Sequence, residues 1–154
     1  MEKKIRIAIN GFGRIGRAFY KLVRLRPEFE IVAVNDLGDP ENMSYLLKYD
    51  TAYGKADFDI VVVREEEGVE TGFMDGEHKV ILVQEKDATK LPWKEYDIDI
   101  VIESTGFFAT YDKAEVHLTA GAKRVVITAP AKGTPTDGVT GAMVLLGIYN
   151  DKLA

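Results

Sequence analysis

IRIAINGFGRIG, residues 5–16, is the stretch that decides the fold of this chain. Its first half alternates isoleucine with other residues, which predicts a strand over residues 4–10. Its second half spaces three glycines as G-x-G-x-x-G. Apolar residues then recur at helical intervals, so we expect a helix over 14–26 that Pro27 ends. A strand, a glycine turn and a helix in direct succession form the context in which this spacing has a mechanism.

The three glycines have separate physical tasks in such a turn. Gly11 allows the tight turn, Gly13 lets the backbone approach a ligand without a Cβ, and Gly16 lets the helix pack closely on the strand. The amides around Arg14 and Ile15 would lie at the amino end of the helix, where unpaired N–H groups and the helix dipole favour an anion. We therefore expect a pyrophosphate here. The alternative is a glycine-rich turn that holds no ligand.

Asp36 is the expected acidic partner of this turn. It follows a second apolar strand, expected over 31–35, and comes twenty residues after Gly16. A carboxylate in that position accepts both ribose hydroxyls of an adenosine and repels a 2′-phosphate, so the sequence favours NAD over NADP. The alternative is that Asp36 only caps the turn over residues 36–39.

Strand and helix patterns alternate along the rest of the chain. They predict an α/β fold of the Rossmann type, in which a doubly wound, mostly parallel sheet carries an antiparallel hairpin insertion. We expect the whole chain, residues 1–154, to form one dinucleotide-binding domain. The expected elements are a helix starting at Asp39-Pro40, strands over 58–64, 70–74 and 78–83 with a tight turn at Asp75-Gly76, a strand over 98–103, a helix over 111–120 ending at Gly121, a strand over 123–128, a loop over 134–141 and a last strand over 143–146.

Composition excludes several classes of protein. A net charge of −5 argues against a protein that tracks nucleic-acid phosphates. The apolar runs are too short to cross a bilayer and no secretory leader is visible, so we expect a cytoplasmic protein without a membrane partner. With no cysteine in the sequence, neither a disulfide nor a thiolate zinc site can form, and we expect no metal site. The acidic run at 65–67 is interpreted as the solvated tip of a hairpin.

Several longer motifs resemble the amino-terminal, NAD-binding half of phosphorylating glyceraldehyde-3-phosphate dehydrogenases. They occur in order from about residue 5 to about residue 152, so the resemblance covers essentially the whole chain. The motifs are INGFGRIGR at 9–17, VNDL at 34–37, LLKYDT at 46–51, ESTGFF at 103–108, AGAK at 120–123 and VITAPAK at 126–132.

The resemblance implies further cofactor contacts. It implies Lys86 near the adenine, Phe108 and Leu37 on the two faces of that ring, Thr105 and Gly106 along the cofactor backbone, and Thr128 near the nicotinamide. Lys86 stands where the family usually has Arg, so the charge is kept without the planar fork. Ordinary packing is the alternative for Phe108, and a hydroxyl bonded to its own backbone is the alternative for Thr128.

The resemblance also implies that catalysis lies elsewhere. The family uses a cysteine thiolate that a histidine activates, and this chain contains no cysteine. We interpret His78 and His117 as surface or packing residues and nominate no catalytic residue. The chain alone is therefore expected to bind NAD without oxidising an aldehyde.

The expected partners follow from that interpretation. They are NAD and either a separate catalytic domain or a second copy of the chain through self-association. A non-catalytic nucleotide-binding module, natural or engineered, is the alternative function. A dehydrogenase that uses Tyr and Lys is disfavoured, because no Tyr-x-x-x-Lys spacing occurs in the sequence.

Overall fold

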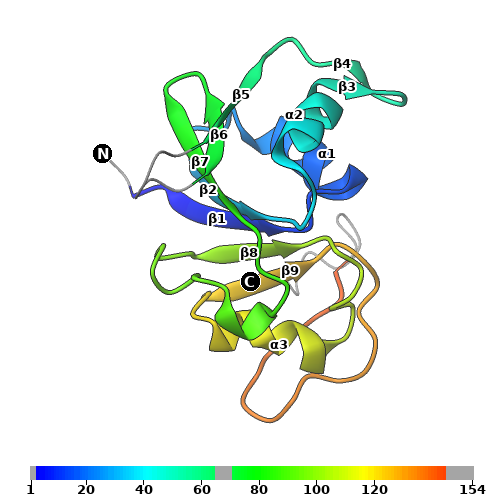
Figure 1. Ribbon diagram of the computed structural model, residues 1–154. Helices are drawn as coiled ribbons and strands as arrows, with labels where there is room; N and C mark the ends of the chain where they lie inside the picture. The colour runs from blue at the N-terminus through cyan, green and yellow to red at the C-terminus, as the bar shows by residue number, and fades with distance from the viewer. Residues whose placement is uncertain (1–2, 65–70, 145–154) are drawn as a thin grey trace.

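The computed structural model describes residues 3–64 and 71–144, and its elements follow the expected order (Figure 1). They are β1 (Ile5–Asn10), α1 (Arg14–Val23), β2 (Phe29–Asn35), α2 (Pro40–Lys48), β3 (Tyr49–Asp50), β4 (Gly54–Lys55), β5 (Ile60–Val63), β6 (Gly72–Asp75), β7 (His78–Val83), the 3-10 turn η1 (Ala88–Lys90), β8 (Ile100–Glu103), α3 (Tyr111–Thr119) and β9 (Arg124–Ile127).

The main sheet has seven strands in the order β5-β6-β7-β2-β1-β8-β9. The strands from β7 to β9 pair in parallel, whereas β5, β6 and β7 pair antiparallel. A separate two-stranded ribbon joins β3 and β4. The chain runs from β1 outward to β2, and later returns to place β8 on the other side of β1. The strand order therefore reverses between β1 and β8, and α/β sheets bind ligands at such a switch point.

Helices cover both faces of the sheet because consecutive residues of the buried strands point in opposite directions. Ile7 and Ile9 of β1 pack in one core with Tyr20 of α1. Ala8, between them, packs in a second core that contains Trp93. In Figure 1, α1 and α2 lie beside the β2 half of the sheet and α3 lies below β9. These two cores confirm the expected doubly wound α/β fold.

Local sequence signals predicted some ends of the helices correctly and others less well. Helix α2 begins as expected, because Asp39 Oδ1 accepts the Asn42 N–H at 2.9 Å and Pro40 occupies the first turn. Helix α1 ends at Val23, three residues earlier than its expected end at residue 26. After α3, Gly121 has a φ of +109°, the left-handed conformation expected for it.

Two expectations need correction. The tight turn between β6 and β7 consists of residues 76–77, one position later than expected, because Asp75 still pairs with His78. Met143 and Val144 form no strand, so the described part of the expected last strand is wrong. Residues 145–146 and the acidic run at 65–67 lie outside the described residues.

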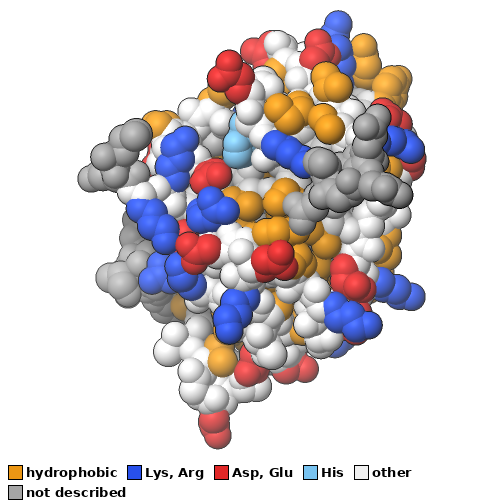
Figure 2. Space-filling view, turned by 60° about the vertical axis from the view of Figure 1, so that its left-hand side comes forward, with side chains coloured by type: hydrophobic (Ala, Val, Ile, Leu, Met, Phe, Trp, Pro, Cys, Tyr) orange, Lys and Arg blue, Asp and Glu red, His pale blue; other side chains and the backbone are white. Residues whose placement is uncertain are grey.

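Charges on the surface are mixed in sign. Figure 2 shows basic and acidic side chains interspersed over one face of the molecule. Among the helices of the described residues, none combines the length and apolar character that a membrane crossing requires.

A half-buried ion pair joins the carboxyl end of α1 to the hairpin of β6 and β7. Arg24 Nε donates to Asp75 Oδ2 at 2.8 Å, and Tyr20 Oη donates to the same oxygen at 3.0 Å. Arg24 also lies over the ring of Phe58, 3.8 Å from its centre. Burial raises the pKa of Asp75, but hydrogen bonds from Arg24 and Tyr20 outweigh that effect and hold the pKa below its ordinary value.

Asp75→Asn is expected to lower the free energy of unfolding at pH 7 by about 3 kcal/mol, because Arg24 is left with an uncompensated, largely buried charge. A carboxylate whose pKa is depressed by folding contributes stability above its unfolded pKa and loses it as the pH falls through its folded pKa. The difference between wild type and Asp75→Asn should therefore shrink below about pH 4. Urea unfolding between pH 7 and pH 3 measures it, and a difference that does not change with pH would contradict this assignment.

Candidate functional site

Almost all the residues expected to contact a cofactor follow the carboxyl ends of parallel strands. Because those ends meet at one edge of the sheet, the structure brings the segments together. The glycine turn follows β1, Asp36 and Leu37 follow β2, Lys86 follows β7, Thr105, Gly106 and Phe108 follow β8, and Thr128 follows β9.

The glycine turn packs tightly in two places and is open in a third. Gly11 has a φ of +92°, and a Cβ there would lie 2.7 Å from the backbone nitrogen of Thr105. A Cβ at Gly16 would lie 2.2 Å from the carbonyl oxygen of Gly11. A Cβ at Gly13 would meet no atom within 4 Å. Gly11 and Gly16 are therefore required by the fold, whereas the fold itself leaves the space beside Gly13 free.

The amino end of α1 can hold an anion. Gly13 is the residue that caps the helix and has no side chain to accept the first N–H groups, and the first turn contains no acidic residue. Arg14 and Ile15 are exposed in this turn. The N–H groups of a helix's first turn have no partner within the helix, so this end offers unpaired donors to a ligand.

Asp36 is linked to the glycine turn by a hydrogen bond. Its Oδ2 accepts the Phe12 N–H at 2.7 Å and its Oδ1 accepts the Gly38 N–H at 2.9 Å. Asp36 therefore does cap the turn that follows it, which was the alternative role. A carboxylate has about four acceptor positions, so two remain for ribose hydroxyls. The two roles are compatible.

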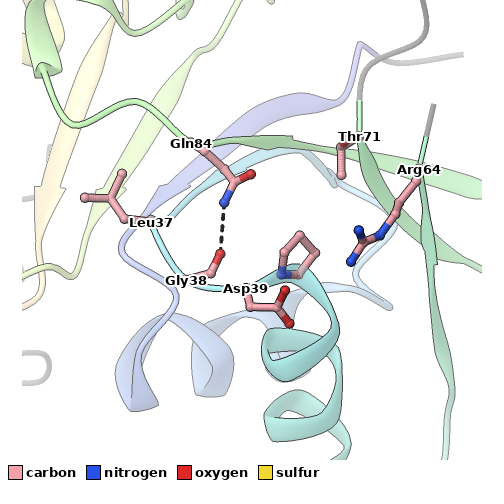
Figure 3. A pocket seen from close by; sticks show the side chains of 7 residues that line it. Leu37, Gly38, Asp39, Arg64, Thr71 and Gln84 are labelled. Atoms are coloured by element: carbon pink, nitrogen blue, oxygen red, sulfur yellow. Dashed lines mark hydrogen bonds between the residues drawn. The ribbon is translucent and has the colours of Figure 1, made fainter. Parts of the chain in front are cut away.

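A cavity of about 600 Å³ lies beside Leu37, whose side chain is 59% exposed (Figure 3). At its edge, Gln84 Nε2 donates to the carbonyl oxygen of Gly38 at 2.9 Å. Lys86 is exposed but does not line this cavity. The lining residues are Leu37, Gly38, Asp39, Pro40, Arg64, Thr71 and Gln84.

A second cavity, of about 210 Å³, lies at the switch point between β1 and β8. It brings together four expected cofactor contacts that are far apart in the sequence: Ile15, Thr105, Gly106 and Thr128. The remaining lining residues are Glu103, Ser104, Ala109, Ile127 and Ala129.

Glu103, which the sequence reasoning did not select, is the central residue of this site. It is 2% exposed, and its Oε1 accepts both the backbone N–H of Thr105, at 2.8 Å, and the hydroxyl of Thr105. Its Oε2 accepts Asn10 Nδ2 at 2.6 Å and faces His117 Nε2 at 3.0 Å. Its backbone carbonyl accepts the N–H and the hydroxyl of Thr128, each at 3.0 Å.

The environment of Glu103 favours its ionised form. Burial raises the pKa of this carboxyl, but hydrogen bonds from His117, Thr105 and Asn10 outweigh that effect, so the pKa lies below its ordinary value. A glutamate that ends an otherwise apolar strand was the signal available in the sequence, since buried charges occur where partners satisfy them.

The two histidines differ in their surroundings. His117 is fully buried, so the packing interpretation is confirmed, although the residue also accepts a hydrogen bond from Trp93 Nε1 at its Nδ1, 3.1 Å away. His78 is exposed, with its Nε2 2.7 Å from the carbonyl oxygen of Ile31. Phe108 is half-buried and its ring lies 5.4 Å from that of His117, whereas Phe107 is 80% exposed.

The sequence of this chain is similar to those of known proteins. A family model described as the NAD binding domain of glyceraldehyde 3-phosphate dehydrogenase matches residues 5–111. Glyceraldehyde-3-phosphate dehydrogenase of Mycoplasma pneumoniae is 50% identical over 85% of this chain and 37% of its own length. That of Thermotoga maritima is 46% identical over 96% of this chain and 41% of its own length. Glyceraldehyde-3-phosphate dehydrogenase 2 of Bacillus subtilis is 43% identical over 97% of this chain and 40% of its own length.

The chain thus spans about two fifths of the length of these relatives. The family model covers more than half of the chain, and its glycine turn, Asp36 and the strands around the switch point all lie inside the matched range. The chain therefore belongs to the glyceraldehyde 3-phosphate dehydrogenase family and contains its NAD-binding domain.

Proposed function

We propose that NAD lies across the carboxyl edge of the sheet, with its pyrophosphate at the amino end of α1. The observation that carries this placement is the free space beside Gly13 in front of the uncapped first turn of the helix. A phosphate in that space would accept backbone N–H bonds and benefit from the helix dipole. Gly13 then permits a closer approach than any residue with a Cβ.

The cavity beside Leu37 supports a position for the adenine end of the cofactor, and the cavity at the switch point supports one for the nicotinamide end. Asp36 would accept the adenosine ribose hydroxyls, and Leu37, Phe108 and Lys86 would surround the adenine. Ile15, Thr105 and Gly106 would line the path along the cofactor backbone. Thr128, at the end of β9, would lie near the nicotinamide in the cavity of about 210 Å³.

Asp36 would also set the preference between NAD and NADP. Phe12 and Gly38 donate backbone N–H bonds to its carboxylate and hold it beside the glycine turn. The negative charge of the carboxylate would repel a 2′-phosphate.

We propose that this 154-residue chain holds the cofactor and does not by itself oxidise a substrate. Bound NAD supplies a hydride acceptor. The chain has no cysteine to form a covalent adduct with an aldehyde, and its buried histidine is occupied by Glu103 and Trp93. The oxidation of glyceraldehyde 3-phosphate would require a catalytic domain. That domain, or a second copy of this chain, is the proposed macromolecular partner.

Calorimetric titration of the chain with NAD, NADP, ADP-ribose and nicotinamide mononucleotide tests the placement. NAD and ADP-ribose should bind with similar affinity, because both present the pyrophosphate and the adenosine ribose. NADP should bind at least about tenfold more weakly, because one unfavourable charge contact is worth roughly 1.4 kcal/mol or more. Strongest binding by the mononucleotide, or no binding by NAD, would refute the proposed placement.

An assay with glyceraldehyde 3-phosphate, NAD and phosphate tests the second part of the proposal. The chain alone should give no NADH. Turnover by the chain alone would show that other residues supply the nucleophile, and would favour a complete dehydrogenase over a binding domain.

A further inference from the structure

We infer that Glu103 is a positioning residue for the cofactor site, acting through the turn at Thr105 and held in place by His117 and Trp93. This inference rests on the proposed placement of NAD. Glu103 sits beneath the cavity at the switch point, and four hydrogen-bond donors converge on its two carboxylate oxygens.

The chemistry of the donors fixes the protonation of His117. An indole Nε1 can only donate, so the Trp93 contact at 3.1 Å makes His117 Nδ1 an acceptor without a proton. The ring nitrogen that faces Glu103 Oε2 at 3.0 Å must then carry the proton. His117 is therefore the neutral Nε2–H tautomer, and it donates to an ionised Glu103. Asn10 Nδ2, 3.5 Å from His117 Nε2, is a second donor beside it rather than its partner.

The same direction of donation continues across the sheet. The Glu85 N–H donates to Asn35 Oδ1 at 3.0 Å, and Asn35 Nδ2 donates to Asn10 Oδ1 at 2.7 Å. Asn10 Nδ2 then donates to Glu103 Oε2. Asn35 Nδ2 also donates back to the Glu85 carbonyl oxygen at 3.0 Å. In both asparagines the side-chain oxygen accepts from the preceding donor and the Nδ2 group donates onward. The series therefore leads to the carboxylate of Glu103 and ends there, because an ionised carboxylate only accepts.

The carboxylate in turn fixes the parts of the site that would face the cofactor. It holds both the N–H and the hydroxyl of Thr105, and the hydroxyl oxygen accepts the Phe107 N–H at 3.0 Å. The turn after β8 is thereby held against Gly11, where a Cβ would come within 2.7 Å of the Thr105 nitrogen. Ser104 reinforces the contact, because its hydroxyl donates to the carbonyl oxygen of Gly11 at 2.7 Å. The phosphate-binding turn and the Thr105 turn therefore move as one unit.

An amide cannot replace this carboxylate. Glutamine has one acceptor oxygen and one NH₂ group, so in either orientation of Glu103→Gln at least one N–H donor faces the NH₂ group. In one orientation the NH₂ group faces the backbone N–H of Thr105, which cannot rotate away, so the Thr105 turn must move. In the other it faces Asn10 Nδ2 and His117 Nε2, so the bonds that hold this side chain in place beneath the turn are lost. Loss of a hydrogen bond to a charged group corresponds to roughly a tenfold to hundredfold change in an equilibrium.

The first experiment measures NAD binding to Glu103→Gln and Trp93→Phe by calorimetry, beside a matched control. Tyr20→Phe removes a buried donor from a different carboxylate, that of Asp75, and keeps the ring that packs on Phe12. Glu103→Gln should bind NAD at least about tenfold more weakly. Trp93→Phe frees the His117 tautomer and should weaken binding about threefold or more. Tyr20→Phe should lose stability but keep wild-type affinity.

The second experiment is spectroscopic and separates positioning from simple stabilisation. Nitrogen-15 NMR should show the Nε2–H tautomer of His117 in wild type and a mixture of tautomers in Trp93→Phe. Saturating NAD should shift the His117 Nε2–H resonance in wild type. Thr105→Val keeps the backbone N–H but loses the hydroxyl that donates to Glu103, so it should reduce that shift at saturation. A shift of wild-type size in Thr105→Val would overturn the inference, because the coupling would not depend on the Thr105 hydroxyl.

The outcomes distinguish the inference from the proposed function. If wild type binds no NAD, the proposed placement fails and the inference fails with it. If wild type binds NAD and folded Glu103→Gln or Trp93→Phe binds it equally well, only the inference fails. If Glu103→Gln does not fold, the Trp93→Phe affinity and the Thr105→Val spectra decide the matter.

Discussion

Gly16→Ala is expected to destabilise the chain by about 3 kcal/mol and to abolish NAD binding. A Cβ at this position would lie 2.2 Å from the Gly11 carbonyl oxygen, a separation that atoms cannot adopt without movement of the backbone. The Gly11 oxygen belongs to the backbone of the turn after β1 and Gly16 belongs to the first turn of α1, so the strain cannot be relieved by a rotating side chain. Urea unfolding followed by circular dichroism measures the loss of stability, and calorimetry measures the loss of binding.

Gly13→Ala is the matched comparison from the same turn. Gly13 has an extended backbone with φ −71° and ψ −160°, which alanine adopts, and a Cβ there meets no atom within 4 Å. Stability should stay within about 0.5 kcal/mol of wild type. NAD affinity should nevertheless fall at least about tenfold, because the methyl group would occupy the space proposed for the pyrophosphate. Unchanged affinity in Gly13→Ala would show that the phosphates lie elsewhere.

Asp36→Ala should weaken NAD binding about a hundredfold, through two lost ribose contacts and a disturbed glycine turn. The Phe12 N–H, which donates to Asp36 Oδ2 at 2.7 Å, would lose its partner beside the phosphate site. The preference for NAD over NADP should also disappear, because the repulsive charge is gone. Calorimetry with both dinucleotides measures the affinity and the preference together.

Asp50→Ala serves as the control for that substitution. Asp50 Oδ1 likewise accepts two backbone N–H groups, from Ala52 and Tyr53 at 2.8 and 2.9 Å, in the ribbon of β3 and β4. Its substitution removes the same kind of interaction from a turn outside the proposed site and should leave NAD affinity unchanged. An equal loss of affinity in both variants would mean that the effect of Asp36 is not specific to the ribose.

Local patterns were sufficient where one segment determines its own structure. The strand, turn and helix around Gly11 could be predicted because isoleucine alternation and glycine spacing act over neighbouring residues. The start of α2 could be predicted for the same reason, since Asp39 accepts the N–H of Asn42 only three positions away. The end of α1 was predicted less well, because no strong stop signal separates Val23 from Arg26.

The group around Glu103 could not be predicted in that way. Its partners Asn10 and His117 are 93 and 14 positions away in sequence, and Trp93 reaches it only through His117. These four residues lie on two strands, a loop and a helix, so no periodicity in the sequence connects them. In the sequence, His117 is one residue of a predicted helix with no mark of its role, whereas in the structure it is fully buried.

The α/β order, the glycine turn and the acid that follows β2 could all be inferred from the amino-acid sequence, because they depend on short-range sterics and on the periodicity of apolar residues. The shared cavity of Thr105 and Thr128 comes from the tertiary fold, as does the role of Glu103, whose carboxylate holds Thr105 and whose backbone carbonyl holds Thr128. The physical reason is parallel pairing. It places the carboxyl ends of β1, β8 and β9 side by side and excludes water between them, so their polar groups must satisfy one another.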